Sequence, residues 1–598
     1  MDIVRLSRRD FLHDMSRGAS DPKRFWTTYR SVTSDYLRIP SVLHRGTSTA
    51  DTPRLQAILL NEQFVSNFSN TTSTSQPDVT NPALADVPSL NTVQCSDEDV
   101  LGLMYGMRSR VATGPDDISS PLIKGCAHTI APTLTALFNQ SLSSSKVPAA
   151  WKRSNITPIF KAGDRSNANN YRPISLLPLC SKLLERVVHN ALLKHVLKHG
   201  LLSPKQFGFR PGSSTQEALL AATRDWHSIL ERRGSVGCVF FDLSKAFDTL
   251  PHTLVLSSLT NVGVSGSLLK WFEDYLSGRT QRVVLQGSAS PHAKVTSGVP
   301  QGSILGPLLF SIALNSSSKL SLSKHAVLSM FADDMALYRP IFNNEDTLAL
   351  QCDVALLADW VESEGLKLNI DKTKIMLISR KKVKPALNIW VNGSKIEVVT
   401  TFRYLGVNIS DDLSWQPHIN YLCSRAKQRL GFIYRTFTQA NVQCLAHLYK
   451  SLVKPLLEYC SAVWDPHQVT LIGKLERVQG FAAKLATRCW SSHGQEVVSK
   501  LGWPKLAARR AYHKICICRR ILKGHSIIPP DVFTPHPYTG SLRHHNSIQL
   551  YKPLVKTNYH RAAYFISVVS LWNRVPEYIT AMPTELTFKK HLNNFLVV

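Results

Sequence analysis

The sequence predicts a fold of mixed α and β structure (α+β or α/β), followed by a C-terminal region that is mostly helical and basic. Short apolar runs alternate with helical patterns between residues 233 and 410, as in a sheet packed against helices. From residue 411 onward, amphipathic helical patterns dominate. Residues 411–598 contain 25 Lys and Arg against nine Asp and Glu, in a chain whose formal net charge is +28. This surplus favours a polyanionic partner.

Residues 1–85 are predicted to form an N-terminal segment that ends in a linker. Short helical patterns at residues 25–26 and 57–64 precede the polar tract 69–76, whose Ser, Thr and Asn content is typical of a flexible linker. From about residue 86 to residue 232, helical periodicity dominates, with one strand-like run at residues 155–160.

Three acidic residues lie within or at the end of strand-like runs in the central segment. Asp333 and Asp334 interrupt the apolar run 327–338, and Asp242 ends the run 236–242. Two adjacent carboxylates in an apolar run require a tight turn and a positive charge that offsets their repulsion. Three carboxylates on neighbouring strands are the minimum set for two-metal phosphoryl transfer. An isolated Asp-Asp pair is more often a solvated turn, so the neighbouring motifs decide between these interpretations.

The motifs of the central segment resemble the palm motifs of reverse transcriptases, in the form found in non-LTR (LINE-like, jockey-like) retrotransposons. In chain order they are NYRPISLLP (170–178), QFGFRPGSST (206–215), FFDLSKAFDTLPH (240–252), TSGVPQGSILGPLLF (296–310), FADDMALY (331–338), GLKLNIDKTKIM (365–376) and FRYLGVNIS (402–410). Three later motifs resemble the region that follows the polymerase in jockey-like proteins: LLEYCSAVWDPH (456–467), KLERVQGFAAKLATR (474–488) and SLWNRVPEYI (570–579). An upstream motif, ATGPDDI (112–118), carries Asp117 where the family usually has glycine.

The resemblance implies a right-hand polymerase with fingers, palm and thumb. It assigns residues 86–232 to the fingers and 233–410 to the palm, with the reverse transcriptase core at about 141–410. Residues 411–490 would form a helical thumb, and residues 491–598 a basic C-terminal region.

The implied activity is that of an RNA-directed DNA polymerase that extends a primer 3′-hydroxyl with dNTPs on an RNA template. Asp242, Asp333 and Asp334 would hold two Mg²⁺ ions, for which Mn²⁺ is an alternative, and the carbonyl of Leu243 would complete one coordination shell. In such sites one ion activates the 3′-hydroxyl and the other neutralises the triphosphate and pyrophosphate.

The resemblance also implies how the nucleotide is bound. Phe247 matches the aromatic position that lies under the sugar and excludes a 2′-hydroxyl. Lys161 and Arg172 match cations that bind the triphosphate, for which the planar guanidinium is well suited. Gln301 and Gly302 would lie beside the base and the template.

Contacts with template and primer are carried over in the same way: Phe209 and Arg210 for the template backbone, and Tyr404, Leu405 and Gly406 for the primer end. A plain strand turn is the alternative for the last three. Lys372 or Lys374 would be the general acid that protonates pyrophosphate. Asp248 is expected to be a helix N-cap with a proline in the first turn, rather than a fourth metal ligand.

Two rival functions remain open at this point. A decayed, non-catalytic nucleic-acid-binding remnant of a retroelement would keep the fold and the charge, but the three aspartates and Phe247 are intact. An RNA-templated RNA polymerase would often have a polar acid near the sugar, so Phe247 argues for DNA synthesis, and the adjacent Asp248 leaves that argument open.

The remaining features of the sequence concern the cellular compartment of the protein. Eleven scattered cysteines without CxxC pairs suit reduced thiols, and Cys516 and Cys518 with His513 lack the spacing of a zinc site. No stretch of 18 uncharged apolar residues is present, so we expect a soluble intracellular protein without a membrane partner. Nuclear residence is implied by the family alone, and the basic run 380–384 is either an import signal or a solvated loop. The sequence does not indicate an oligomeric state.

An endonuclease domain of about 200 residues does not fit into the first 85 residues. A C-terminal nuclease or RNase H would need clustered acids, and the nine acids after residue 410 are widely spread. We therefore expect a truncated or partial element product that lacks the nuclease which prepares a DNA primer or target.

Overall fold

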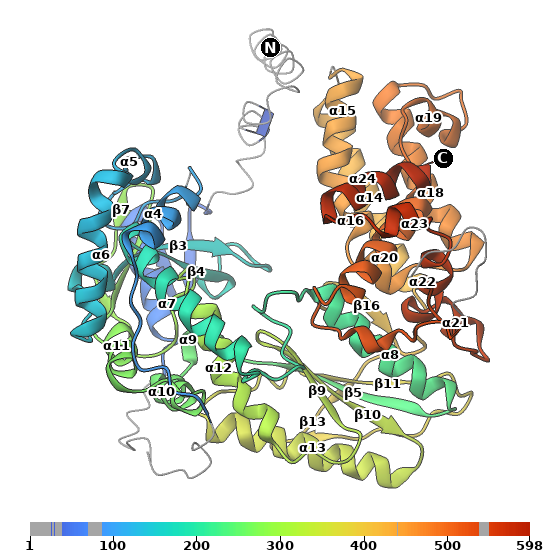
Figure 1. Cartoon of the computed structure of the whole chain (residues 1–598). Coiled ribbons are helices and arrows are strands. Elements are labelled where there is room, and N and C mark those ends of the chain that lie inside the picture. The colour runs from blue at the N-terminus through green and yellow to red at the C-terminus, as the bar shows by residue number, and fades with distance from the viewer. Residues whose placement is uncertain are drawn as a thin grey trace.

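The computed structural model describes residues 25–26, 29, 39–69, 87–109, 111–438, 440–537 and 549–597. Two lobes rise from a common base that contains a sheet (Figure 1). The first lobe holds helices and a second sheet from the first half of the chain, and the other lobe is helical and C-terminal. Residues 70–76 of the predicted linker lie outside the described residues.

The base contains a five-stranded sheet in the order β14-β11-β5-β10-β9. Its strands are β5 (Ser235–Asp242), β9 (Val327–Phe331), β10 (Asp334–Ile341), β11 (Lys374–Ile378) and β14 (Glu397–Val398). All neighbours are antiparallel except β11 and β14. The strands predicted at residues 236–242 and 327–338 are confirmed, and the second is a hairpin.

Alternate side chains of β5 enter two different hydrophobic cores. Val236, Cys238 and Phe240 pack with the C-terminal lobe, whereas Val239 and Phe241 pack on the other face. Successive residues of a strand point to opposite faces, so a strand buried on both faces is apolar throughout. Helix α8 (Thr215–Glu231) contributes to the first core, and α13 (Asn344–Ser363) contributes to the second.

The second sheet has the order β4-β3-β6-β7, with β8 also paired to β6. It consists of β3 (Arg153–Phe160), β4 (Tyr171–Leu176), β6 (Thr280–Leu285), β7 (Ser288–Ala289) and β8 (Ala293–Lys294). The strand predicted at residues 155–160 is confirmed inside β3. Strand β6 belongs to the predicted palm range but pairs in parallel with β3 of the predicted fingers range, so the sheets do not separate at residue 232.

The N-terminal segment packs against this second sheet. Helix α3 (Pro53–Val65) confirms the helix predicted at residues 57–64, and the short strands β1 (Leu43–Arg45) and β2 (Ser48–Ala50) precede it. The remaining helices before β9 are α4 (Asp97–Gly106), α5 (Ser120–Gly125), α6 (Ala127–Ser143), α7 (Leu179–Lys198), α9 (Ala246–Thr249), α10 (His252–Asn261), α11 (Gly266–Leu276) and α12 (Gly306–Leu314). Short strand pairs follow β11: β12 (Trp390–Val391) with β13 (Ser394–Lys395), and β15 (Thr401–Tyr404) with β16 (Val407–Ser410).

The C-terminal lobe is helical in its described residues, as predicted. Its helices are α14 (Gln416–Thr436), α15 (Val442–Leu448), α16 (Lys454–Glu458), α17 (Ser461–Trp464), α18 (Val469–Thr487), α19 (Gly494–Lys500), α20 (Leu506–Leu522), α21 (Asn558–Ala562), α22 (Tyr564–Trp572), α23 (Glu577–Thr580) and α24 (Glu585–Val597). A π-helical turn, Tyr449–Val453, separates α15 from α16. Pro455 lacks a backbone N–H at this point, which disfavours a regular continuation.

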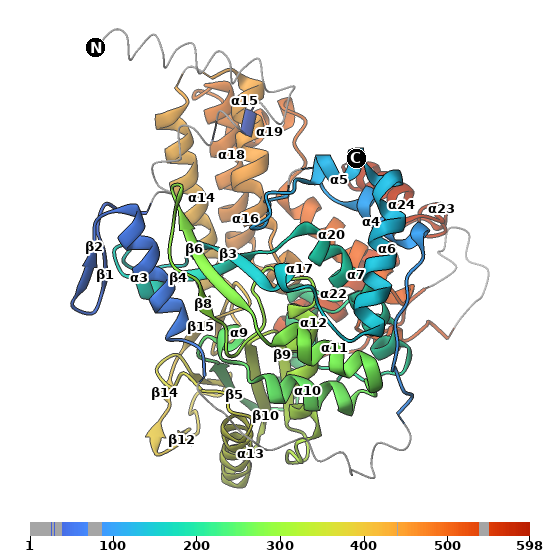
Figure 2. The ribbon, with the colours of Figure 1, turned by 90° about the vertical axis from the view of Figure 1, so that its left-hand side faces the viewer.

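One hydrophobic core joins the base sheet to the C-terminal lobe. It extends from Trp226 and Phe240 through Tyr404 and Trp464 to Leu592. Figure 2 shows α14, α18 and α20 standing above β5 and β10 in the second view. No helix in the described ranges is long and apolar enough to cross a bilayer.

Candidate active site

The hairpin β9–β10 brings two acidic residues to the end of the base sheet. Phe331 pairs with Asp334, so Ala332 and Asp333 form a two-residue turn. Asp334 lies directly opposite Asp242 of β5 in the antiparallel register. The backbone positions of the three predicted carboxylates therefore lie at the same end of the neighbouring strands β5 and β10.

The segment that follows Ser203 packs against the turn of the β9–β10 hairpin and holds it in place. Met330 exchanges backbone hydrogen bonds with this segment, from Phe207 N to Met330 O (2.8 Å) and from Met330 N to Lys205 O (3.0 Å). A Cβ at Gly208 would lie 2.3 Å from the backbone nitrogen of Ala332, so only glycine fits there. Ala332 itself has φ +56°, a left-handed conformation that costs about 1 kcal/mol for a residue with a Cβ.

The electrostatics of this edge combine crowded carboxylates with nearby cations. Asp334 keeps solvent-accessible surface, yet protein atoms around its carboxyl group reduce hydration, and with the charges of Asp333 and Asp242 they raise its pKa to about 6. Lys161 and Arg172 act in the opposite direction. The ammonium of Lys372 lies 3.5 Å from a carboxylate oxygen of Asp242.

Three carboxylates are the donor type that a divalent cation takes. As placed, no three His, Cys, Asp or Glu side chains of the described residues form a ready metal cluster. The site nevertheless fits a cation in its chemistry, because burial and the charges of Asp333 and Asp242 raise the pKa of Asp334, and a positive ion would offset both effects. A cation would have to draw Asp242, Asp333 and Asp334 closer than they stand.

The turn that carries Phe247 is held by the loop of residues 297–305, which belongs to the motif at residues 296–310. Val299 N donates to Phe247 O (2.9 Å), and Gly298 N donates to Leu250 O (2.8 Å). The ring of Phe247 stacks on Phe310, with centroids 4.3 Å apart and planes 9° apart. The phenyl group is thereby held in one orientation.

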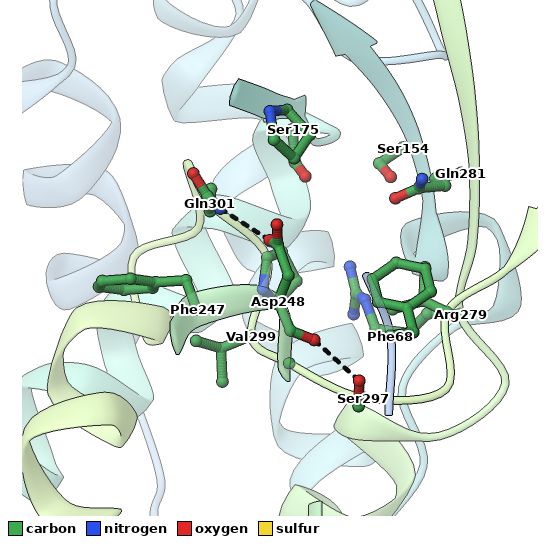
Figure 3. Close-up of a pocket in the computed structure, with 14 residues that line it drawn as sticks. Phe68, Ser154, Ser175, Phe247, Asp248, Arg279, Gln281, Ser297, Val299 and Gln301 are labelled. Carbon is green, nitrogen blue, oxygen red and sulfur yellow. Dashed lines mark hydrogen bonds between the residues drawn. The ribbon is translucent and has the colours of Figure 1, made fainter. Parts of the chain in front are cut away.

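Asp248 is not the N-cap that the sequence predicted. Pro251 occupies that position before α10, and the Asp248 side chain instead accepts a hydrogen bond from Gln301 Nε2 at 2.7 Å. Figure 3 shows the two side chains pointing toward each other, with the ring of Phe247 on the same side of Asp248 as Gln301. Burial raises the pKa of Asp248. Its partner lies 53 positions later in the chain, so helix-start rules could not find the contact.

Gln301 and Gly302 lie against the strand that carries Arg172. Ser175 N donates to Gln301 O at 2.6 Å. Gly302 has φ +115°, and a Cβ there would lie 2.6 Å from Ser175 O. Lys161 and Arg172, both exposed, lie at the loop end of the β3–β4 hairpin, and the positive charges of both act on Asp334.

The structure separates the two lysines proposed as general acid. Lys372 faces Asp242, whereas the ammonium of Lys374 is 2.7 Å from Glu397. Lys372 is therefore the better candidate of the pair.

Of the two predicted template residues, Phe209 lies beside Phe247. Phe209 has φ +55°, is 46% exposed, and meets the ring of Phe247 edge-on at 6.1 Å. The Arg210 guanidinium donates to the carbonyls of Ser203 (2.8 Å) and Leu202 (3.4 Å), so in this structure it supports its own loop.

Tyr404, Leu405 and Gly406 form the end of the β15–β16 hairpin, with φ +46° at Leu405 and +83° at Gly406. The hydroxyl of Tyr459 donates to Leu405 O at 2.9 Å and thus ties this hairpin to the C-terminal lobe. Tyr459 lies within the motif at residues 456–467, but its contact could not be predicted because the partner is a backbone carbonyl more than fifty residues away.

The structure also shows where Asp117, the basic run 380–384, Cys516 and Cys518 lie. Asp117 has φ +54°, which explains why glycine is usual there and why Asp, tolerant of this region, is accepted. In the basic run 380–384, the Arg380 guanidinium lies 4.4 Å from the Tyr559 ring centroid. Cys516 and Cys518 are buried in α20, while His513 contacts Ser461 and Arg509.

Residues 159–409 match the family model described as "Reverse transcriptase (RNA-dependent DNA polymerase)". This segment is a reverse transcriptase domain. The domain contains all the predicted metal, nucleotide, template and primer residues. The predicted right-hand polymerase fold is thereby confirmed for the domain.

Curated relatives of the reverse transcriptase domain are non-LTR retrotransposon proteins, as the motifs predicted. The "Probable RNA-directed DNA polymerase from transposon BS" of Drosophila melanogaster is 25% identical over 74% of this chain and 50% of its own length. The "RNA-directed DNA polymerase from mobile element jockey" of Drosophila funebris is 26% identical over 70% of this chain and 47% of its own. The chain therefore spans about half the length of these relatives.

Two solved telomerase structures are also similar to the chain. Apo telomerase from Candida tropicalis has a TM-score of 0.33 at 15% identity and covers 48% of this chain and 60% of its own. Telomerase from Candida albicans with a telomeric RNA fragment has a TM-score of 0.32 at 14% identity, over 73% and 78% of the two chains.

Proposed function

We propose that the chain is an RNA-directed DNA polymerase of a non-LTR retrotransposon that extends a primer 3′-hydroxyl with dNTPs. The observation that supports it best is the meeting of Asp242, Asp333 and Asp334 at one sheet edge, opposite Lys161 and Arg172. Carboxylates that hold metal and cations that hold phosphate are the two halves of a phosphoryl-transfer site.

Asp242, Asp333, Asp334 and the carbonyl of Leu243 would hold the Mg²⁺ ions. When bound, the ions would lower the pKa of the primer hydroxyl and neutralise charge on the leaving pyrophosphate. Lys161 and Arg172 would bind the triphosphate from the β3–β4 hairpin, and Lys372 would donate the proton to pyrophosphate.

The sugar would lie against Phe247, whose ring is held in place by Phe310 and the loop at Val299. This arrangement favours dNTPs over NTPs, because a rigid ring cannot move aside for a 2′-hydroxyl. The β15–β16 hairpin would support the primer end, and nuclear residence would place the protein beside its DNA target.

Primer extension on poly(rA)/oligo(dT) with Mg²⁺ and dTTP tests the proposal. We expect extension by the wild-type chain, and its loss on addition of EDTA or in Asp333→Asn/Asp334→Asn. Asp359→Asn/Glu362→Gln on exposed positions of α13 changes the net charge equally and should extend normally. If the folded wild-type chain binds the hybrid without extending it, the chain is a binding remnant rather than a polymerase.

A further inference from the structure

Three aromatic side chains form an exposed cluster at one end of the C-terminal lobe. Tyr434, Phe481 and Trp490 are 54%, 40% and 47% exposed. The Trp490 ring lies 6.2 Å from Tyr434 and 5.9 Å from Phe481, centroid to centroid. Large aromatic rings usually lie in cores, so a contiguous exposed group indicates a binding surface.

Cations share the surface with these rings. Helix α18 presents Arg477, Phe481 and Lys484 at spacings of four and three residues, which is one face of a helix. The Lys484 ammonium also donates to the carbonyl of Trp490 at 3.4 Å.

The adjacent helix α14 continues the same surface. The side chain of Lys474 on α18 hydrogen-bonds to Asn420 on α14, so these faces lie side by side. Lys427 precedes Tyr434 by seven residues, two turns along one helix face. Burial raises the pKa of the Cys423 thiol, and the positive charges of Lys474, Lys427 and Arg477 partly offset this rise, so all three cations act on the same part of α14. We call Lys427, Tyr434, Arg477, Phe481, Lys484 and Trp490 the α14–α18 face.

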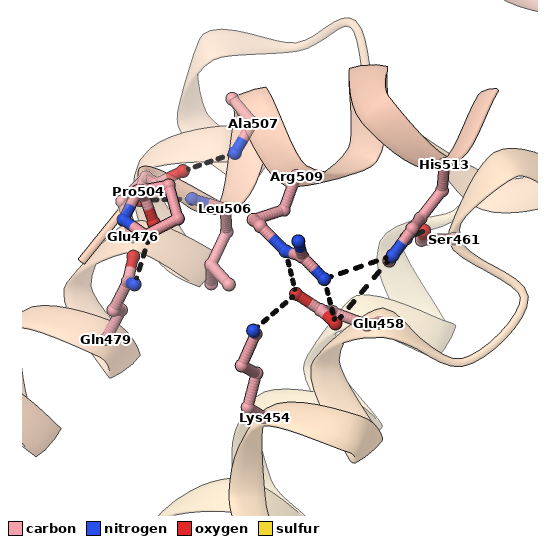
Figure 4. Close-up of polar contacts among 10 residues, drawn as sticks. All are labelled: Lys454, Glu458, Ser461, Glu476, Gln479, Pro504, Leu506, Ala507, Arg509 and His513. Atoms are coloured by element: carbon pink, nitrogen blue, oxygen red, sulfur yellow. Dashed lines mark hydrogen bonds and ion pairs between the residues drawn. The ribbon is translucent and has the colours of Figure 1, made fainter. Parts of the chain in front are cut away.

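No carboxylate opposes these cations from the two helices. Helix α14 has no Asp or Glu, and α18 has Glu476 alone. Figure 4 shows that Glu476 is directed to the start of α20, where it accepts from Leu506 N (3.2 Å) and Ala507 N (2.9 Å). The cations and rings of the face are therefore not opposed by an acid from α14 or α18.

The chemistry of the face fits unpaired nucleic acid better than duplex. Aromatic rings stack on bases that are free of a partner, whereas a duplex shows its phosphates and hides the base faces. The face is also remote from the carboxylates. The ends of α14 and α18 lead into α15 and α19, which stand at the top of the lobe in both views, and β9 and β10 lie at the base (Figures 1 and 2).

We propose that the α14–α18 face binds an unpaired stretch of RNA by stacking bases on Tyr434, Phe481 and Trp490 and by pairing phosphates with Lys427 and Arg477. It rests on the proposed function only in the choice of RNA as the strand. The face would hold template RNA outside the primer hybrid.

Fluorescence anisotropy with a labelled U20 RNA tests this binding. We expect Phe481→Ala/Trp490→Ala to weaken U20 binding about tenfold or more, since each stacked base contributes substantially. Binding of a blunt RNA–DNA hybrid should be unchanged. Trp490→Phe should restore most of the U20 affinity, and Trp390→Ala, an equally exposed tryptophan on β12, should have no effect.

The salt dependence of RNA binding distinguishes the contribution of the aromatic rings from that of the cations. Arg477→Gln should reduce the slope of log Kd against log salt by about 0.7, whereas the ring variant should keep the slope. Equal losses for U20 and hybrid, or no loss in the ring variant, would overturn the inference. Primer extension is measured alongside: a wild-type chain that fails to extend but loses U20 binding in the ring variant would refute the polymerase and leave the face intact.

Discussion

Gly298→Ala is the sharpest test of how the turn that carries Phe247, the proposed nucleotide gate, is held. Gly298 has φ +81°, and a Cβ there would lie 2.5 Å from Phe247 O and 2.7 Å from Asp248 O. Both contacts are with backbone, so the turn that carries Phe247 must move by roughly 0.5–1 Å to restore ordinary contact distances. The left-handed backbone costs about 1 kcal/mol for alanine, and the displacement adds about 1–3 kcal/mol.

The matched control is Gly287→Ala in the β6–β7 turn. Gly287 has φ +80° with nothing within 4 Å of its Cβ position, so it carries the backbone strain without the clash. In primer extension, we expect kcat/KM for dTTP to fall about 10²-fold in Gly298→Ala, since a shift near 1 Å misplaces a reacting group. Gly287→Ala should fall only slightly. Equal kinetics and equal melting temperatures for the two variants would show that the loop does not position the gate.

Three further outcomes are expected. Phe247→Ala should reduce discrimination between dTTP and UTP by about tenfold or more, measured as the ratio of kcat/KM values; unchanged discrimination would remove Phe247 from the gate. Lys372→Ala should lower kcat about 10²-fold while Lys374→Ala changes it little, and the reverse order would assign the general acid to Lys374. Burial and Arg403 lower the pKa of His418 to about 4, and its neutral ring accepts from Asn408 N. The pKa of histidine in the unfolded chain is near 6.5. The stabilisation from the neutral His418 ring is therefore fully present above pH 6.5 and falls by about 1 kcal/mol per pH unit toward pH 4. The melting temperature should thus drop less between pH 7 and 5 in His418→Gln than in wild type.

Local patterns predicted the elements that carry the carboxylates. An apolar run that ends in Asp242 and a second one broken by Asp333 and Asp334 correspond to β5 and the β9–β10 hairpin. These patterns can be recognised because a central strand is apolar on both faces, so acidic residues stand out where the strand ends or turns.

Contacts between segments that are distant in the chain could not be predicted from the sequence. The helix start assigned to Asp248 failed because the residue is bonded to Gln301, and nothing near Asp248 in the chain encodes that partner. The pairing of β6 with β3 likewise crosses the predicted boundary at residue 232. Such contacts depend on tertiary packing, which propensity and spacing do not contain.

The shared core described above limits how the molecule can be divided. Phe240 and Tyr338 of the base sheet pack in the same apolar cluster as Trp464, Trp572 and Leu592. A fragment that stopped at residue 409, the end of the reverse transcriptase match, would leave this face of the base sheet uncovered and prone to aggregate. The smallest piece that can be purified and assayed as a polymerase therefore includes the helices that lie beyond the family match.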